Sequence, residues 1–296
     1  MSLPNFMCLG AAKSGTTTLY DILRQHPDIY IPRFKEPHFF DIPENYKNGI
    51  EWYKTNYFRN ANKRIIADFT PSYFFEKESP KRIFKNLGKD MKFVVILRNP
   101  VDRAYSHYLH SKRDEYESLS FNNALENENV RLLKYQDKND YLSYLRKSYV
   151  HQGLYAEMLQ RYLVYYSLEN FLFIDFEEEF LNNRKNTINT ILAFLELDNS
   201  IDLKINLKSN PASKQRSRIL KRVMKNRGLW KRVLKFLVPS IQLRQIIRNK
   251  IQRANISSFT PERLDDKFKI ELFDRYFKED IINFEKISKK KLSWYL

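Results

Sequence analysis

The sequence has few of the residues that mark disulfide-bonded, zinc-binding or membrane-spanning proteins. Its 296 residues include one cysteine, Cys8, and five histidines, so an internal disulfide is excluded and no Cys/His cluster has zinc-ligand spacing. No run of about 18 apolar residues is present, which excludes a transmembrane helix. After Met1 there is neither a basic segment nor a long apolar one, so we predict no secretory signal and a soluble, cytoplasmic protein.

Apolar and basic residues, in contrast, are abundant. Hydrophobic residues make up 43% of the chain and aromatic residues 15%, which excludes a disordered or collagen-like protein. The length suits one large α/β domain or two small ones. Lysine and arginine number 52 against 35 aspartate and glutamate, so the formal net charge is +17.

Short apolar runs alternate with amphipathic segments through the first two-thirds of the chain. The runs predicted as strands are Asn5–Leu9, Arg64–Ala67, Phe93–Leu97 and Phe171–Phe176. The segments predicted as helices are Thr16–Gln25, Pro80–Leu87, Val101–Ser111, Leu154–Tyr166 and Thr187–Leu195. Strands that alternate with helices imply right-handed crossovers and a parallel sheet, so we expect a doubly wound α/β core.

The positive charge is concentrated late in the chain. Leu203–Pro261 holds sixteen lysines and arginines and no acidic residue, and its apolar residues recur at helical spacing, which predicts a basic amphipathic helix or helix pair. Glu262–Ile287 is predicted as one long amphipathic helix, with Thr260 as its N-cap and Pro261 at its first position. We therefore expect a single domain over 1–296, composed of an α/β core (1–200), a basic helical lid or insert (203–260) and a C-terminal helix that returns to the core (261–296).

The most informative segment, Gly10–Thr18 (GAAKSGTTT), joins the first predicted strand to the first predicted helix. Small residues at such a turn let backbone N–H groups converge on an anion at a helix N-terminus. Gly10 and Gly15 have Walker A spacing, but Thr16 stands where the Walker lysine belongs and Lys13 lies inside the loop. The segment therefore predicts a phosphate-binding loop that is not built for Mg·ATP, the alternative being a turn that only caps the helix.

A second candidate site begins where the most apolar strand ends. Arg98 follows that strand, Pro100 forces a turn, and Ser106 lies about two helical turns further on. A guanidinium and a hydroxyl suit a terminal phosphate monoester. The alternatives are that Arg98 pairs with a surface carboxylate and that Ser106 faces solvent. Asp68, after the second predicted strand, keeps an ATP-dependent kinase open as a competing function.

Together these two segments resemble the 5′-phosphosulfate and 3′-phosphate binding motifs of sulfotransferases that use 3′-phosphoadenosine-5′-phosphosulfate (PAPS). Lys35–Asp41 (KEPHFFD), Asn45–Tyr53 and Thr70–Phe74 are similar to the heparan-sulfate and bacterial carbohydrate branch of that family, as is the C-terminal end of the chain. The resemblance implies a P-loop-like three-layer fold with a central parallel sheet. It also implies transfer of a sulfuryl group from PAPS, which leaves as PAP, without a metal.

The resemblance also implies roles for individual residues. Lys13 would neutralise the leaving phosphate, and Arg98 with Ser106 would hold the 3′-phosphate. The cradle for the 5′-phosphosulfate would be Ser14, Gly15, Thr16, Thr17 and Thr18. A late basic segment resembles the loop that closes over the cofactor, and its candidate contacts are Lys214 and Arg216.

The proton acceptor is expected in the KEPHFFD segment. The family's glutamate maps onto Glu36, which we favour over His38, although the unperturbed pKa of a histidine lies nearer neutrality. The alternative for Glu36 is a salt bridge with Lys35 or Arg33. Candidate acceptor contacts are Phe39, Phe69 and Tyr73. Phe69 stands where glycan-acting relatives carry a lysine, so the resemblance to heparan-specific enzymes is weakest there.

The expected acceptor is a hydroxyl or amine of a small molecule, natural product or saccharide. The basic segment has four interpretations: a lid over PAPS, a peripheral contact with an anionic membrane, a nucleic-acid contact that no recognition motif supports, and a solvated helix face. The competing functions are thus the kinase and a basic membrane- or nucleic-acid-binding protein. The sequence makes no prediction of oligomeric state.

Overall fold

The computed structural model describes residues 3–207, 213–215, 256–258 and 262–294. The chain divides into two compact units, Met1–Ser209 with Leu264–Leu296, and Asn210–Arg263. In the second unit the described residues form an antiparallel pair, β6 (Ser213–Gln215) with β7 (Ile256–Ser258). The basic amphipathic helix predicted between them lies outside the described residues. Among the helices that the structure describes, none has both the length and the apolar character needed to span a bilayer.

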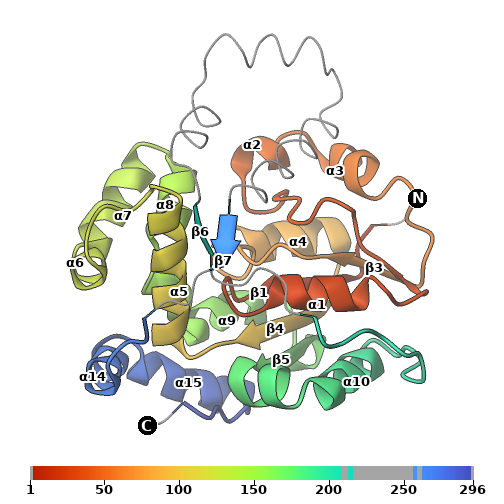
Figure 1. Cartoon of the computed structure of the whole chain (residues 1–296). Helices are drawn as coiled ribbons and strands as arrows, with labels where there is room; N and C mark the ends of the chain where they lie inside the picture. The colour runs from red at the N-terminus through yellow and green to blue at the C-terminus, as the bar shows by residue number, and fades with distance from the viewer. Residues whose placement is uncertain (1–2, 208–212, 216–255, 259–261, 295–296) are drawn as a thin grey trace. The chain divides into compact units, whose positions relative to one another are not determined.

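The first unit is built on a parallel sheet of five strands in the order β2-β3-β1-β4-β5 (Figure 1). The strands are β1 (Phe6–Gly10), β2 (Ile29–Tyr30), β3 (Ile65–Asp68), β4 (Lys92–Leu97) and β5 (Phe171–Asp175). All residues of β1 and β3 are buried, as expected for strands covered on both faces. The predicted α/β fold with a central parallel sheet is confirmed, and β2 is a short edge strand that the sequence did not reveal.

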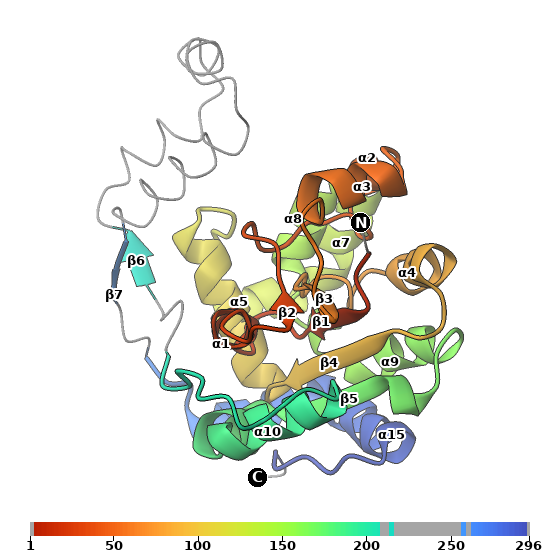
Figure 2. The same ribbon diagram turned by 90° about the vertical axis from the view of Figure 1, so that its right-hand side faces the viewer.

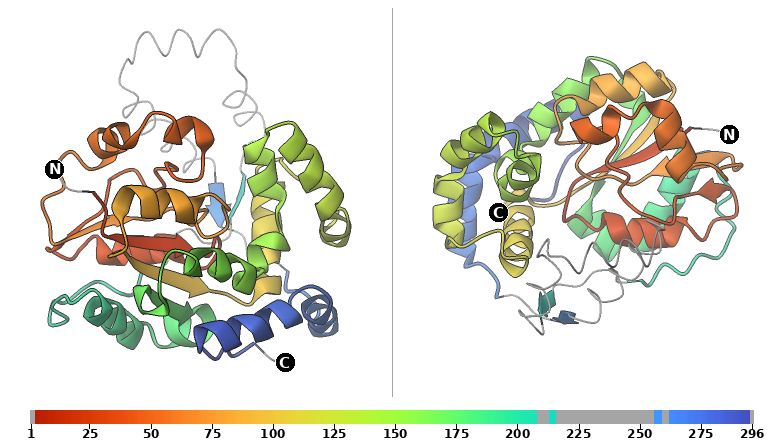
Figure 3. Two further views of the ribbon diagram at one scale, coloured as in Figure 1. Left: turned by 180° about the vertical axis from the view of Figure 1, so that it is seen from behind. Right: turned by 90° about the horizontal axis from the view of Figure 1, so that it is seen from above.

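Helices cover both faces of this sheet (Figures 2 and 3). They are α1 (Thr16–Leu23), α2 (Pro43–Tyr46), α3 (Ile50–Tyr57), α4 (Ser79–Leu87), α5 (Pro100–Arg113), α6 (Phe121–Glu126), α7 (Glu128–Asp137), α8 (Tyr141–Lys147), α9 (Tyr155–Leu163), α10 (Arg184–Phe194), α14 (Asp266–Tyr276) and α15 (Lys278–Ser288). Short helical turns span His151–Gly153 and Leu168–Asn170, and a π-helix spans Phe176–Asn182. The four helices α2, α6, α7 and α8 were not predicted, nor was α3.

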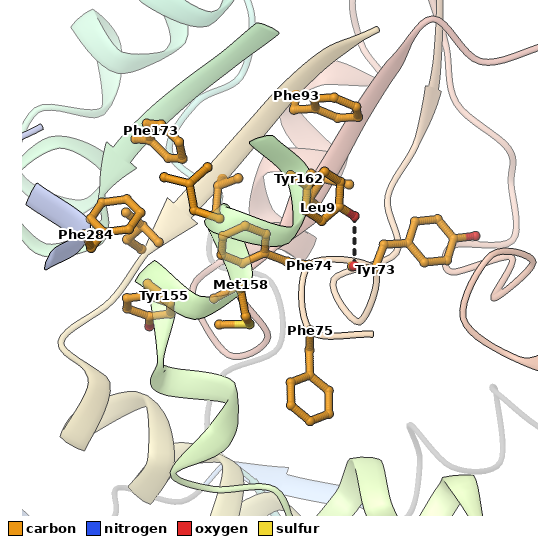
Figure 4. Close-up of a cluster of buried hydrophobic side chains, with 14 of the residues drawn as sticks. Leu9, Tyr73, Phe74, Phe75, Phe93, Tyr155, Met158, Tyr162, Phe173 and Phe284 are labelled. Atoms are coloured by element: carbon orange, nitrogen blue, oxygen red, sulfur yellow. Dashed lines mark hydrogen bonds between the residues drawn. The ribbon is translucent and has the colours of Figure 1, made fainter. Parts of the chain in front are cut away.

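The strands contribute alternate residues to two apolar clusters. Met7 and Leu9 join a cluster with α4, α9 and α15, whereas Phe6 and Cys8 join one with α1 and α10. Figure 4 shows part of the first cluster, in which Tyr162 donates a hydrogen bond of 2.8 Å to the carbonyl of Tyr73. This period-two alternation holds the sheet between two helical layers.

The predicted C-terminal helix is corrected by the structure. Instead of one helix from Glu262 to Ile287, α14 begins at Asp266, with Asp265 as its N-cap, and α15 begins after a break at Phe277. The ring of Phe277 is 1% exposed and packs so close to Gly153 that a Cβ there would lie 2.7 Å from it. Burial of that ring accounts for the break. The predicted cap, Thr260, and the proline after it lie outside the described residues.

Candidate functional site

The predicted phosphate loop runs from the end of β1 into α1. The amide of Ala11 donates to the Ile96 carbonyl of β4 over 2.7 Å, so the loop is tied to the neighbouring strand. Gly15 has φ +80°, and a Cβ there would lie 2.9 Å from the rings of Phe176 and Phe180. Both its conformation and the space require glycine.

The loop contains a buried polar atom without a partner. The side chain of Ser14 is 0% exposed, and among the described residues its hydroxyl has no hydrogen-bond partner. Buried hydroxyls in folded proteins are nearly always bonded. A hydroxyl left open at the start of a helix therefore indicates a place for a ligand oxygen.

Lys13 lies within the same loop, with φ +74° and a half-buried side chain. Burial and the nearby guanidinium groups of Arg113, Arg98 and Arg146 lower its pKa to about 8, against a smaller opposing effect of Glu36. Within the part of the chain that the structure describes, Lys13 forms no ion pair with a carboxylate. Arg113 and Arg146 share one carboxylate, Asp114, at 3.0 and 3.1 Å, so the region around Lys13 keeps an excess of positive charge that an anion would offset.

Arg98 joins the two predicted phosphate motifs. Its Nη1 atom donates to the carbonyl oxygen of Lys13 over 3.1 Å, and its guanidinium lies 5.1 Å from the ring of Phe176. Its Nε atom is buried without a hydrogen bond among the described residues and lies 3.7 Å from Oε1 of Glu177. The predicted loop and the predicted arginine are therefore adjacent, and a carboxylate also lies beside that arginine.

Glu177, at the start of the π-helix, is the carboxylate in question. Burial raises its pKa to about 7, although the positive charge of Arg98 opposes this rise. The hydroxyl of Tyr155 meanwhile donates to the carbonyl of Arg98 over 2.8 Å. Two neighbouring elements thus hold Arg98 at the tip of β4.

Helix α5 begins directly after Arg98. Asn99 caps it, accepting from the amides of Val101 at 3.1 Å and Asp102 at 3.4 Å. Ser106, predicted to bind the 3′-phosphate, is half-buried on this helix, and His110 and Arg113 follow it at helical spacing on the same side.

The KEPHFFD segment brings three charged side chains together. The ammonium of Lys35 lies 3.1 Å from Oε1 of Glu36, and Nε2 of His38 lies 3.6 Å from Oε2. Partial burial alone would raise the pKa of Glu36, but Lys35 and His38 outweigh it and hold that pKa well below its ordinary range. The salt bridge with Lys35 that was the alternative interpretation of Glu36 is therefore present, whereas Arg33 forms none among the described residues.

His38 is held in its charged form by a second carboxylate. Its Nδ1 atom lies 2.7 Å from Oδ2 of the fully buried Asp41, which also accepts from the Ser72 hydroxyl over 2.5 Å. Burial alone would lower the pKa of His38, but the hydrogen bond to Asp41 and the nearby carboxylate of Glu36 raise it to about 10. An imidazolium at neutral pH cannot accept a proton, which favours Glu36 as the base.

The three predicted acceptor contacts lie in the core. Phe39 is 0% exposed and stacks on Tyr53 at 4.5 Å, and Phe69 is 1% exposed with its ring edge-on to Tyr20. Tyr73 is 0% exposed and accepts a hydrogen bond from the amide of Phe39. Phe39 and Tyr73 therefore support the KEPHFFD segment from the core side. Phe69 packs instead with Phe6 and Tyr20 in the other apolar cluster.

Asp68, on which the kinase interpretation depends, is fully engaged inside the protein. Its Oδ2 accepts from the hydroxyls of Tyr53 at 2.6 Å and Tyr73 at 3.1 Å, and its Oδ1 accepts from Thr70 at 2.6 Å. Burial raises its pKa to about 6, with those hydrogen bonds opposing the rise. Both oxygens hold core hydroxyls together, which disfavours a role as a magnesium ligand.

Two further predicted residues belong to the second unit. Lys214 lies in β6, and Arg216 lies outside the described residues.

Sequence reasoning also missed several charged residues that the fold brings to the site. Lys35 was named as the first residue of the KEPHFFD segment and as a salt-bridge partner, without a role of its own. Arg113 and Arg146 belonged to no motif.

Comparison with known proteins identifies the class to which this fold and site belong. The model of the family described as "Sulfotransferase domain" matches residues 3–284, so the chain belongs to the sulfotransferase family. The predicted resemblance to sulfotransferases and their P-loop-like fold is thereby confirmed.

The particular relatives are both human and bacterial. Human heparan sulfate glucosamine 3-O-sulfotransferase 3B1 is 32% identical over 204 residues, which cover 67% of this chain and 47% of that protein. The human isoform 6 is 32% identical over 199 residues, covering 66% and 52%. The chain spans about half the length of these curated relatives. A solved sulfotransferase from Alicyclobacillus acidocaldarius is 32% identical, with a TM-score of 0.61, covering 71% of this chain and 88% of that one.

Proposed function

We propose that this protein transfers a sulfuryl group from PAPS to a hydroxyl or amine of a saccharide or small-molecule acceptor. The observation that carries the proposal is the 3.1 Å hydrogen bond from Arg98 to the carbonyl of Lys13. Because the phosphate loop and the arginine-tipped strand are adjacent, a single adenosine carrying phosphates at its 5′ and 3′ positions can reach both. Membership in the sulfotransferase family supports the same reaction.

The residues present fit a bis-phosphorylated nucleotide. Buried polar atoms of Ser14 and Arg98 have no hydrogen-bond partner among the described residues, and these are the types of donor that phosphate oxygens accept from. We assign the 5′ end to Lys13 and the loop from Ser14 to Thr18, and the 3′-phosphate to Arg98 and Ser106. When bound, PAPS supplies the sulfuryl group and leaves as PAP.

The remaining chemistry belongs to the protein's own side chains. Glu36 accepts the proton of the acceptor hydroxyl, because its carboxylate is ionised. His38 cannot take this role, because it is already protonated. Asp41 fixes the orientation of the His38 ring, which in turn holds Glu36. Lys13 stabilises the negative charge that develops on the leaving phosphate.

For the acceptor we favour a saccharide hydroxyl. The human relatives act on heparan sulfate glucosamine by their names. The KEPHFFD segment of this chain resembles the heparan-sulfate and bacterial carbohydrate branch of the family. Arg113 and Arg146, which share the single carboxylate of Asp114, add a net positive charge near Lys13.

The test compares thermal stabilisation by PAP, AMP and ATP with Mg²⁺. At a ligand concentration near 100 Kd, binding to the native state adds about 2.7 kcal/mol to the unfolding free energy. We expect PAP to raise Tm without metal and AMP, which lacks the 3′-phosphate, to raise it much less. Equal shifts with AMP and PAP would remove the role of Arg98 and Ser106. A shift only with Mg·ATP would favour the kinase instead, and no shift with any nucleotide would favour a basic binding protein.

A further inference from the structure

Lys35 connects two parts of the site that the proposed roles treat separately. Its ammonium donates to Oγ1 of Thr17 over 2.9 Å, to Oγ1 of Thr16 over 3.3 Å and to Oε1 of Glu36 over 3.1 Å. The threonines begin α1, directly after the phosphate loop, whereas Glu36 is the proposed base. The side chain of Lys35 is 16% exposed, so it is held in place yet open to the site.

Lys35 therefore lies where the sulfuryl group would pass during transfer. In-line transfer places the moving group between the donor phosphate and the acceptor oxygen, and therefore between the loop and the base. Lys35 Nζ bonds to residues on both sides of that interval. A preorganised donor at such a point commonly contributes about 10²–10³ to the rate.

An ammonium has three N–H donors, and all three of Lys35 are engaged in the free protein. A bond to a new oxygen must therefore replace one of them. The hydrogen bond to Glu36 is the one whose loss affects the chemistry. Without it the Glu36 carboxylate becomes more basic, at the time when it has to accept a proton.

We propose that Lys35 is a catalytic residue whose ammonium leaves Glu36 to hydrogen-bond the sulfuryl oxygens during transfer. The inference rests on the proposed function. In the step itself the acceptor oxygen forms a bond to sulfur as the bond from sulfur to the 5′-phosphate oxygen breaks. The acceptor proton passes to Glu36, and the electron pair of the broken bond leaves on PAP.

The experiment measures PAP and PAPS binding by calorimetry for wild type, Lys35→Met and Lys35→Arg. The two ligands share the 5′- and 3′-phosphates and differ by the sulfuryl group. We expect Lys35→Met to weaken PAPS at least about tenfold, the scale of a charge-assisted hydrogen bond, with a much smaller effect on PAP. Lys35→Arg keeps the charge and should recover part of the PAPS affinity. Turnover of Lys35→Met, measured with an active acceptor, should fall by about 10²–10³.

The matched control is Lys54→Met, since Lys54 pairs with Glu51 at 3.4 Å on α3 and is 23% exposed. It should leave both affinities unchanged. Equal losses of PAP and PAPS affinity in Lys35→Met, or no loss of either, would overturn the role of Lys35. Failure of the wild-type protein to bind PAP at all would instead overturn the proposed function, so the two failures are distinguishable.

Discussion

At the scale of single residues, the site depends on how its ionisable side chains control one another. Glu36 lies between Lys35 and His38, and both cations keep its carboxylate ionised. His38 remains protonated because Asp41 accepts its other ring proton. Of Glu36 and His38, only Glu36 can therefore accept a proton from the substrate at neutral pH, because His38 is already protonated and Asp41 is occupied by its ring.

Substitution of Glu36 by glutamine tests that assignment. Glu36→Gln keeps the size of the side chain and removes its ability to accept a proton, so we expect PAP binding to persist and turnover to fall by at least about 10². Steady-state rates with an active acceptor, together with calorimetric PAP binding, measure the two effects. His38→Asn is the companion variant, and near-normal turnover of Glu36→Gln combined with an inactive His38→Asn would transfer the base role to the histidine.

At the scale of elements, the site is made where two parallel strands end side by side. β1 leads into the phosphate loop and β4 leads into Arg98, and their register places Met7 beside Phe93. The π-helix after β5 contacts both of these segments, because Phe176 and Phe180 pack against Gly15 and Glu177 lies beside Arg98. Three consecutive strands of the sheet thus contribute to one region at their carboxyl ends.

Substitution of Gly15 by alanine tests the packing of this loop. The new Cβ would lie 2.9 Å from two aromatic rings at a φ of +80°, so we expect Gly15→Ala to lower the unfolding free energy by about 1–3 kcal/mol and to abolish PAP binding. Urea unfolding and calorimetry measure both quantities.

Gly49 provides the control for this substitution. It has φ +81°, but a Cβ there meets nothing within 4 Å. Gly49→Ala should therefore show the backbone strain of about 1 kcal/mol without loss of PAP binding. If Gly15→Ala bound PAP as well as Gly49→Ala does, the close packing of the loop against the π-helix would have no part in cofactor binding.

At the scale of the whole molecule, charge is the dominant feature. Sixteen of the 52 basic residues fall within 203–261, a stretch without acidic residues. This charge accumulates in the sequence next to a unit whose site is already cationic through Lys13, Arg98, Arg113 and Arg146. Such a charge distribution favours anionic partners. We predict that one of them is the surface of an anionic membrane.

Vesicle flotation tests this prediction. Each basic residue near an anionic surface contributes about 1 kcal/mol, and salt screens the attraction beyond a Debye length of about 10 Å at 0.1 M. We expect flotation with phosphatidylserine vesicles at low salt, release at high salt, and none with neutral vesicles. A variant with glutamine at Lys221, Arg222, Lys231 and Arg232 should lose flotation and keep the PAP-induced Tm shift. No flotation of the wild-type protein at low salt would remove the membrane contact.

Local sequence was sufficient for the elements whose residues decide their own structure. The apolar strand before Arg98, the glycine-rich turn after β1 and the helix begun by Pro100 were all predicted, because strand periodicity, glycine conformation and proline geometry act over a few residues. The family followed from motifs in the right order. The break at Phe277 was not predictable, because the ring is buried against Gly153, which is distant in the sequence.

The sequence by itself determined the class of fold, the family and the candidate site residues, since each depends on short motifs. Only the tertiary structure decided which of those residues meet. In the folded protein Arg98 donates a hydrogen bond to the carbonyl of Lys13, and Asp68 accepts hydrogen bonds from core hydroxyls. Lys35 donates to Thr16, Thr17 and Glu36 at the same time. The physical reason is that hydrogen bonding and charge interaction act over a few ångströms, and the folded sheet, rather than spacing along the chain, sets those distances.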